Sequence, residues 1–147
     1  MKLRGKITPM KKFILVLLFF PTLTIAASIQ DYLDNTPGWA EEVKEVIYLT
    51  TRCSGIMMVT GEHRIVVGDS ETGEKLLMVG QQLAMESGLL AINSGISVEN
   101  IKERTVFWMK KYADDSINNT NNYNNIFVGD YAEDFTFCDA LVEVMYQ

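Results

Sequence analysis

Two cysteines, Cys53 and Cys138, have the clearest chemistry in this sequence. They form no CxxC pair, the usual mark of a redox-active motif. A zinc site usually needs four ligands, and His63 is the only histidine that would join them. Each cysteine lies in phase with apolar residues at helical spacing. We expect a structural disulfide that joins an early helix to the last one.

His63 is also the natural candidate for acid–base chemistry, with Glu62 or Asp69 to orient it. No serine or cysteine nucleophile stands in a setting such as GxSxG. Neighbouring residues on a helix point about 100° apart, so adjacent carboxylates do not converge on one reacting atom. We expect His63 on a surface loop and three carboxylate pairs on solvated faces: Glu41–Glu42, Asp114–Asp115 and Glu133–Asp134. The sequence therefore predicts no catalytic residue, no metal site and no cofactor.

Sulfur and aromatic side chains are abundant beyond position 27. The methionines occur at core-like helical positions, so we expect them to fill a core rather than to bind copper. A CxxCH haem-attachment motif is absent. Phe137 stands beside Phe135 and falls off the apolar stripe of its predicted helix. We expect Phe137 to contribute to a binding surface, together with Tyr131 and Trp108.

The first 27 residues have the three parts of a cleavable signal peptide. Basic residues at positions 2–12 precede the apolar run 13–20, and small residues follow Pro21, so that cleavage after Ala26 or Ala27 fits. The opening Met10-Lys11-Lys12 makes Met10 the alternative start. The apolar tract of about 15 residues is shorter than the roughly 20 that a membrane span needs. We therefore expect residues 28–147 to form one exported domain, periplasmic or secreted, that meets the membrane only during export.

The net charge of that domain differs from the charge of the whole chain. Of 13 basic residues, five lie before position 28, whereas all 19 acidic residues lie after it, so the domain carries a formal charge of −11. Nucleic acids and anionic lipids are bound by clustered Lys and Arg. The charge thus excludes nucleic acid as an expected partner, and it fits a soluble protein or one with a basic partner.

Apolar residues at spacings of three and four predict four helices beyond position 35. The first begins at Thr36-Pro37 and fades between Met58 and Glu62, and the segment 63–68 continues it or connects it to the next. The second is predicted from Glu74 to about Ile92 after a cap at Asp69-Ser70, and the third follows a cap at Ser97 and includes Tyr112 on its buried side. An Asn-rich loop at 118–125 precedes the last helix, predicted from about Ile126 to Met145. Gly80 and Ala84 would let another helix approach closely.

These features predict an all-α domain similar to a small four-helix bundle, stapled by one disulfide. In general form it resembles small periplasmic inhibitors, immunity proteins and chaperones, with which it shares no motif. We expect a non-enzymatic module that binds another exported protein. Two alternatives stay open: a small hydrolase whose site is assembled from scattered carboxylates and His63, and a carrier with an apolar cavity between its helices.

Overall fold

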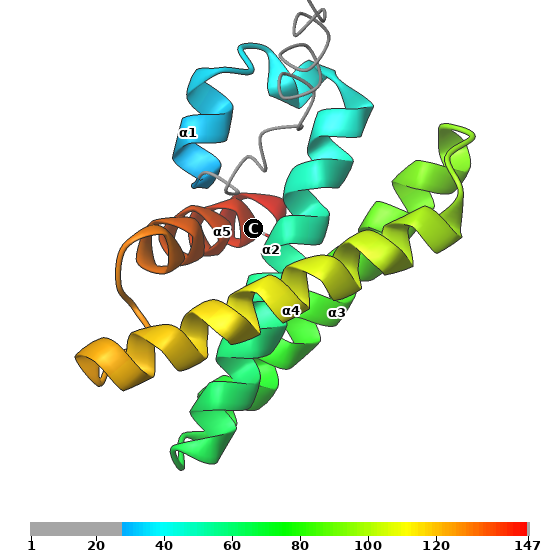
Figure 1. Ribbon diagram of the computed structural model, residues 1–147. Helices are drawn as coiled ribbons and strands as arrows, with labels where there is room; N and C mark the ends of the chain where they lie inside the picture. The colour runs from blue at the N-terminus through cyan, green and yellow to red at the C-terminus, as the bar shows by residue number, and fades with distance from the viewer. Residues whose placement is uncertain (1–27, 147) are drawn as a thin grey trace, which may run out of the picture.

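The computed structural model describes residues 28–146, so the predicted signal peptide lies outside the described residues. The described part is all-α, as predicted, and contains no strand. It consists of five α-helices and one short 3-10 helix (Figure 1): α1 (Ile29–Asp34), η1 (Trp39–Glu41), α2 (Val43–Val66), α3 (Ser70–Asn93), α4 (Val98–Tyr123) and α5 (Asp130–Tyr146).

The central helix is α2, which is buried at every position from 49 to 57. Its buried polar residues are satisfied locally or by a neighbour. The hydroxyls of Thr50 and Thr51 each donate to a carbonyl one turn back at 2.8 Å. The hydroxyl of Ser54 donates to the carbonyl of Gly80 in α3 at 2.7 Å. A helix that is buried on all sides lies at the centre of its domain, and its polar side chains then need hydrogen-bond partners within the protein.

Glycines allow α3 and α4 to approach α2 closely. A Cβ atom on Gly61 would lie 2.7 Å from the carbonyl oxygen of Gly73 in α3. A Cβ atom on Gly55 would lie 2.7 Å from Cβ of Trp108 in α4. Real Cβ atoms do not come that close to other heavy atoms, so the helices can pack at this distance only without a side chain there. The close approach predicted at Gly80 is confirmed, because its Cβ would lie 3.0 Å from the carbonyl oxygen of Ser54.

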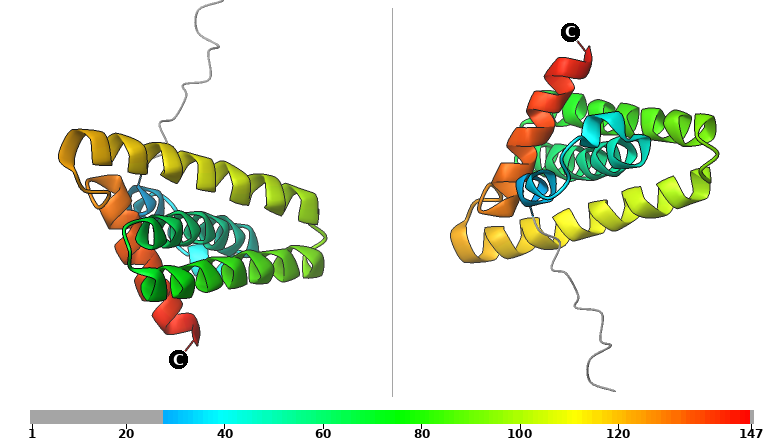
Figure 2. Two further views of the ribbon diagram at one scale, coloured as in Figure 1. Left: turned by 90° about the horizontal axis from the view of Figure 1, so that it is seen from below. Right: turned by 90° about the horizontal axis from the view of Figure 1, so that it is seen from above.

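The long helices α3 and α4 diverge from the turn that joins them (Figure 2). Figure 2 shows α3 and α4 joined by the 94–97 turn and separating toward their other ends, with α2 between them. The last helix, α5, crosses α2 and packs against α1 (Figure 1). The main core lies where α2, α4 and α5 meet, and a smaller cluster of Ile47, Ala91 and Ile101 lies near the 94–97 turn.

The predicted helix starts and ends are wrong at two places before α3. The chain from 36 does not enter α2 directly, because Gly38 has φ +81° and interrupts the helix, and η1 fills the gap. At its other end α2 does not fade between Met58 and Glu62 but runs to Val66. Of the two alternatives for the segment 63–68, helical extension is therefore correct for residues 63–66, and His63 lies on the last turns of α2 rather than on a loop. The short helix α1 was not predicted.

The predicted Asn-rich loop at 118–125 is also wrong over most of its length, since α4 continues to Tyr123. Helix propensity is a weak preference that tertiary contacts override. Here the side chain of Asn119 donates to the carbonyls of Ile126 and Val128 at 2.9 and 3.2 Å, which fastens the helix end to the following segment. The helix then ends at Asn124, whose φ of 53° is the left-handed conformation that terminates helices.

Candidate functional site

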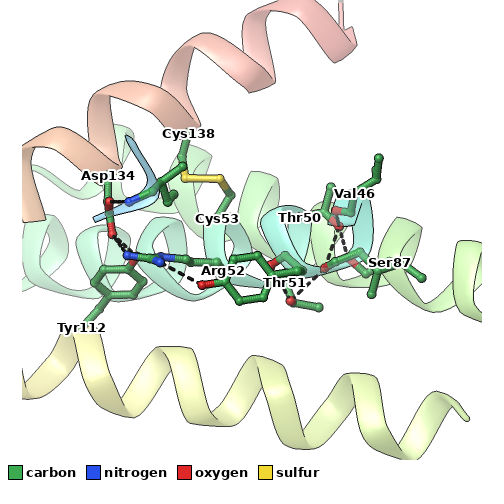
Figure 3. Close-up of a disulfide and its surroundings, with 12 residues drawn as sticks. Val46, Thr50, Thr51, Arg52, Cys53, Ser87, Tyr112, Asp134 and Cys138 are labelled. Carbon is green, nitrogen blue, oxygen red and sulfur yellow. Dashed lines mark hydrogen bonds and ion pairs between the residues drawn. A yellow bond between two sulfur atoms is a disulfide. The ribbon is translucent and has the colours of Figure 1, made fainter. Parts of the chain in front are cut away.

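A group of charged and polar side chains lies where α2, α4 and α5 meet (Figure 3). Nη2 of Arg52 donates to Oδ2 of Asp134 at 2.5 Å, and Nε donates to the hydroxyl of Tyr112 at 2.8 Å. The Tyr112 hydroxyl in turn donates to the same carboxylate oxygen at 2.5 Å. The backbone N–H of Ile29 donates to Oδ1 at 2.6 Å. One carboxylate of α5 thus binds groups from α1, α2 and α4.

This cluster has no contact with solvent. Arg52 is 1% exposed, and Asp134 and Tyr112 are 0% exposed. Burial raises the pKa of Tyr112, so its phenol stays protonated. Burial alone would lower the pKa of Arg52, but the neighbouring Tyr112 and Asp134 raise it overall, so the guanidinium stays charged. Buried charges that are paired and shielded in this way hold a fold together and offer no surface to a substrate.

The predicted disulfide between Cys53 and Cys138 is confirmed, with an S–S distance of 2.03 Å. It lies beside the charged cluster, because Cys53 follows Arg52 in α2 and Cys138 lies one turn after Asp134 in α5 (Figure 3). The covalent bond and the ion pair therefore connect the same turns of the same two helices. Both groups fit a structural role.

The expectation that all paired carboxylates lie on solvated faces is wrong for Asp134, which is buried. A signal was available, since Asp134 is three residues after buried Tyr131 and four before buried Cys138, which puts it on the apolar stripe. Arg52 likewise precedes a buried cysteine. A charged residue on an apolar stripe calls for a partner of opposite charge, and these two are that pair.

The predicted binding surface is wrong for two of its three residues. Trp108 and Tyr131 are 5% and 1% exposed, because both pack into the main core. The hydroxyl of Tyr131 is also used internally, in a hydrogen bond of 2.9 Å with Thr60. Phe137 is half-buried, with its ring 6.4 Å from that of Trp39 in an edge-to-face contact. The structure does not bring the three residues together on one surface.

His63 lines a pocket at the end of α2, next to Arg64 and the segment that follows α4. None of the residues that line this pocket is a carboxylate, so the arrangement of His63 with an acidic partner that the hydrolase alternative needs is not found there. Within residues 28–146, no three His, Cys, Asp or Glu side chains lie close enough to hold a metal ion. Among the helices of the same residues, none combines the length and apolar character of a membrane span.

An apolar groove lies between α3 and α4, near the turn that joins them. Its volume is about 440 Å³. We name it the α3–α4 groove. Its lining includes three large side chains of α3 and three of α4: Met85, Leu89, Ile92, Val98, Ile101 and Val106. Lys102 is the charged residue in this lining.

The side chains of this groove are unusually exposed for their type. Met85, Leu89, Ile92 and Val106 are 64, 56, 59 and 63% exposed. Met85 and Met78 were both predicted to fill the core, and their positions on the surface, Met78 being 65% exposed, correct that prediction. Helical periodicity identifies an apolar stripe, but it does not tell whether a neighbouring helix of the same chain covers it. Here the stripe of α3 is wider than the face that α2 covers.

Comparison with known proteins adds no relative: the chain matches no protein-family model, no curated protein and no solved structure.

Proposed function

We propose that this protein is an exported, non-enzymatic binding module that holds an amphipathic helix of another protein in the α3–α4 groove. The observation that carries the proposal is the row of exposed apolar side chains that lines the groove, with Leu89 and Val106 on opposite walls. Large apolar side chains that adjoin one another on the surface in this way mark a candidate interaction site. The predicted signal peptide and the disulfide support a site of action in an oxidising compartment outside the cytoplasm.

The shape of the groove favours a helix as the occupant. Two antiparallel helices that form a bundle leave a hydrophobic trough along their seam, and a third helix packs into it by placing its ridges in that trough. In this molecule α2 fills the trough on one side of α3 and α4, and α5 crosses α2 elsewhere (Figure 2). The groove is the corresponding trough on the uncovered side.

The exposure of the walls distinguishes this proposal from a small-molecule carrier. A pocket for a small ligand usually buries 70–90% of that ligand, which requires enclosing walls. Leu89 and Val106 expose more than half of their surface to solvent, so a small ligand lying against them would also stay largely exposed to water. Met85 adds a flexible, polarisable side chain that adapts to different apolar partners.

The charge of the domain favours a basic partner over a second copy. Each domain carries a formal charge of −11, so two copies repel each other, whereas a basic helix is attracted during its approach. Inhibitors, immunity proteins and chaperones share with this proposal only that they act by binding another protein. We therefore assign the protein to this broad class, with a helix of apolar face and basic flanks as its target.

The test uses a defined probe rather than a captured partner. A fluorescent peptide with leucines at helical spacing and lysines elsewhere should bind the purified protein, as measured by anisotropy. A peptide of the same composition with the leucines out of phase, and one with glutamates in place of the lysines, should bind about ten-fold more weakly, because the first lacks an apolar face and the second is repelled.

A matched pair of variants locates the binding. Leu89→Asp puts a charge into the groove, whereas Ile117→Asp makes the same kind of change at an exposed position of α4 outside its lining. The first should weaken peptide binding about ten-fold or more and the second should leave it unchanged. Equal effects of the two variants, or equal binding of the in-phase and out-of-phase peptides, would contradict the proposal. A dimer that Leu89→Asp dissociates would show that the groove joins two copies instead.

A further inference from the structure

A second pocket, separate from the α3–α4 groove, lies where the last turns of α2 meet the end of α4 and the segment 124–127. Its volume is about 430 Å³. We name it the Arg64 pocket. The domain has 19 acidic and 8 basic residues, yet the lining of this pocket includes Arg64 and His63 and no carboxylate. It is therefore a locally basic site on a strongly acidic protein.

The guanidinium of Arg64 is unusual because it makes no hydrogen bond to any described residue. Its Nε is buried without a partner. Its Nη1 forms an ion pair with Oδ2 of Asp69 at 3.7 Å, which is beyond hydrogen-bond distance, and the Arg64 side chain as a whole is 39% exposed. Buried polar atoms are normally paired, so this Nε is a donor available to a group from outside the chain.

Aromatic packing fixes the position of this guanidinium. Its central carbon lies 5.5 Å from the centroid of the Phe127 ring. The aromatic residue is itself held by an Asx turn, in which the N–H of Phe127 donates to the side-chain oxygen of Asn125 at 3.0 Å. A planar fork of donors in a fixed plane matches a carboxylate, which accepts two parallel hydrogen bonds from it.

The rest of the pocket selects among anions. The C-terminal ends of α2 and α4 both lie here, and their carbonyls carry partial negative charge, which disfavours anions and disfavours a dianion such as phosphate more than a singly charged carboxylate. Val67, Ile126 and Phe127 provide apolar wall. The ligand that best matches this lining carries one negative charge on an otherwise apolar molecule.

We propose that the Arg64 pocket binds a small organic carboxylate, with the carboxylate on the guanidinium of Arg64 and beside His63, and the apolar part against Ile126 and Phe127. The ligand is a free aromatic or branched acid or the carboxyl end of a peptide, because both present the same chemistry. This inference is independent of the helix proposed for the α3–α4 groove, since none of the residues that line one pocket lines the other.

The test is a titration of the ¹⁵N-labelled protein with four probes, followed through the NMR signals of the Arg64 Nε–Hε group and the Asn124 side-chain amide. Benzoate should give saturable shifts of both signals. Benzyl alcohol, which keeps the ring without the charge, and inorganic phosphate, which keeps charge without the ring, should bind about ten-fold more weakly or not at all. N-acetylphenylalanine represents a peptide end, and tighter binding of it than of benzoate identifies the peptide as the source.

Two arginine variants supply the control. Arg64→Gln should weaken benzoate binding about ten-fold, whereas Arg104→Gln, which removes an exposed arginine of α4 outside the pocket, should not change it. Arg64→Lys keeps the charge without the planar fork and should fall between them. Benzyl alcohol or phosphate binding as tightly as benzoate would overturn the proposal. So would benzoate affinity that is equal in the wild type and in a folded Arg64→Gln or Arg64→Lys variant.

Discussion

Arg52 and Asp134 form an ion pair of 2.5 Å in the core, with side chains that are 1% and 0% exposed. Each residue stands within one helical turn of a disulfide cysteine, so the crossing of α2 and α5 is held both by charge and by a covalent bond. The same carboxylate accepts the N–H of Ile29, which fastens α1 to α5. The crossing is therefore the point on which the position of α1 and α5 depends.

Asp134→Asn should destabilise the protein by about 3 to 5 kcal/mol, because it removes the counter-charge that Asp134 supplies to the buried guanidinium of Arg52. The measurement is urea unfolding at neutral pH. Asp115→Asn is the matched control, since Asp115 accepts from Lys111 at the same 2.5 Å but is 34% exposed. Its cost should be about 0 to 1 kcal/mol, because a pair near solvent gains little. Equal losses in the two variants would show that burial of the pair does not matter.

Replacing both cysteines by alanine should lower the free energy of unfolding by about 2 to 4 kcal/mol, since the Cys53–Cys138 bond closes a loop of 85 positions in the unfolded chain. Wild-type protein kept in a reductant that opens the bond should lose a similar amount. Urea unfolding of the three samples, with and without reductant, measures both values. A double variant as stable as the oxidised wild type would contradict the expected contribution of the bond.

Much of this fold follows from apolar periodicity, and the exceptions have local physical causes. The stripe that contains Cys53 and Met57 and the one that contains Tyr131 and Cys138 are both in the core, which is why the fold class and the disulfide were predictable. The residues at which helices begin and end were less predictable. Asn119 stays helical because it hydrogen-bonds two carbonyls beyond the helix, a contact that appears only in three dimensions.

The candidate sites were harder to predict than the fold. Trp108 and Tyr131 are aromatic residues of the kind that binding surfaces use, but the same residues also fill cores, and here they are buried. Leu89 belongs to an ordinary apolar stripe, and nothing local distinguishes a stripe that its own chain covers from one left open. Arg64 and Phe127 are 63 positions apart and meet only through the packing of α2 against the segment after α4.

Alanine at Gly61 or Gly73 should destabilise the protein by about 1 to 3 kcal/mol, because a methyl group at either position would lie 2.7 Å from a carbonyl oxygen of the facing helix and force α2 and α3 apart. Gly88→Ala is the control within α3, since nothing lies within 4 Å of its Cβ position. That change should stabilise by up to about 1 kcal/mol through helix propensity. Thermal unfolding of the three variants measures the contrast. A loss at Gly88 equal to the loss at Gly61 would mean that helix contact is not the cause.

The stability of the protein should fall as the pH rises from about 10 to about 12, because two buried tyrosines resist deprotonation. Burial raises the pKa of Tyr131 to about 12, against about 10 in an unfolded chain, and it raises the pKa of Tyr112 as well. Across this range the unfolded state loses protons that the folded state keeps. The stabilisation is therefore complete below pH 10 and is lost as pH approaches the folded value, at up to about 1.4 kcal/mol per pH unit for each group.

Tyr131→Phe tests this dependence. It removes one group from the high-pH loss, so its free energy of unfolding should fall less steeply above pH 10 than that of the wild type. At neutral pH it should cost about 1 kcal/mol, since Thr60 loses its 2.9 Å partner. Tyr123→Phe, at a position that is 63% exposed, should leave the slope unchanged. Urea unfolding from pH 8 to 11 supplies the comparison. If the free energy of unfolding falls with pH equally steeply in Tyr131→Phe and in the wild type, the loss of stability at high pH comes from other groups than Tyr131.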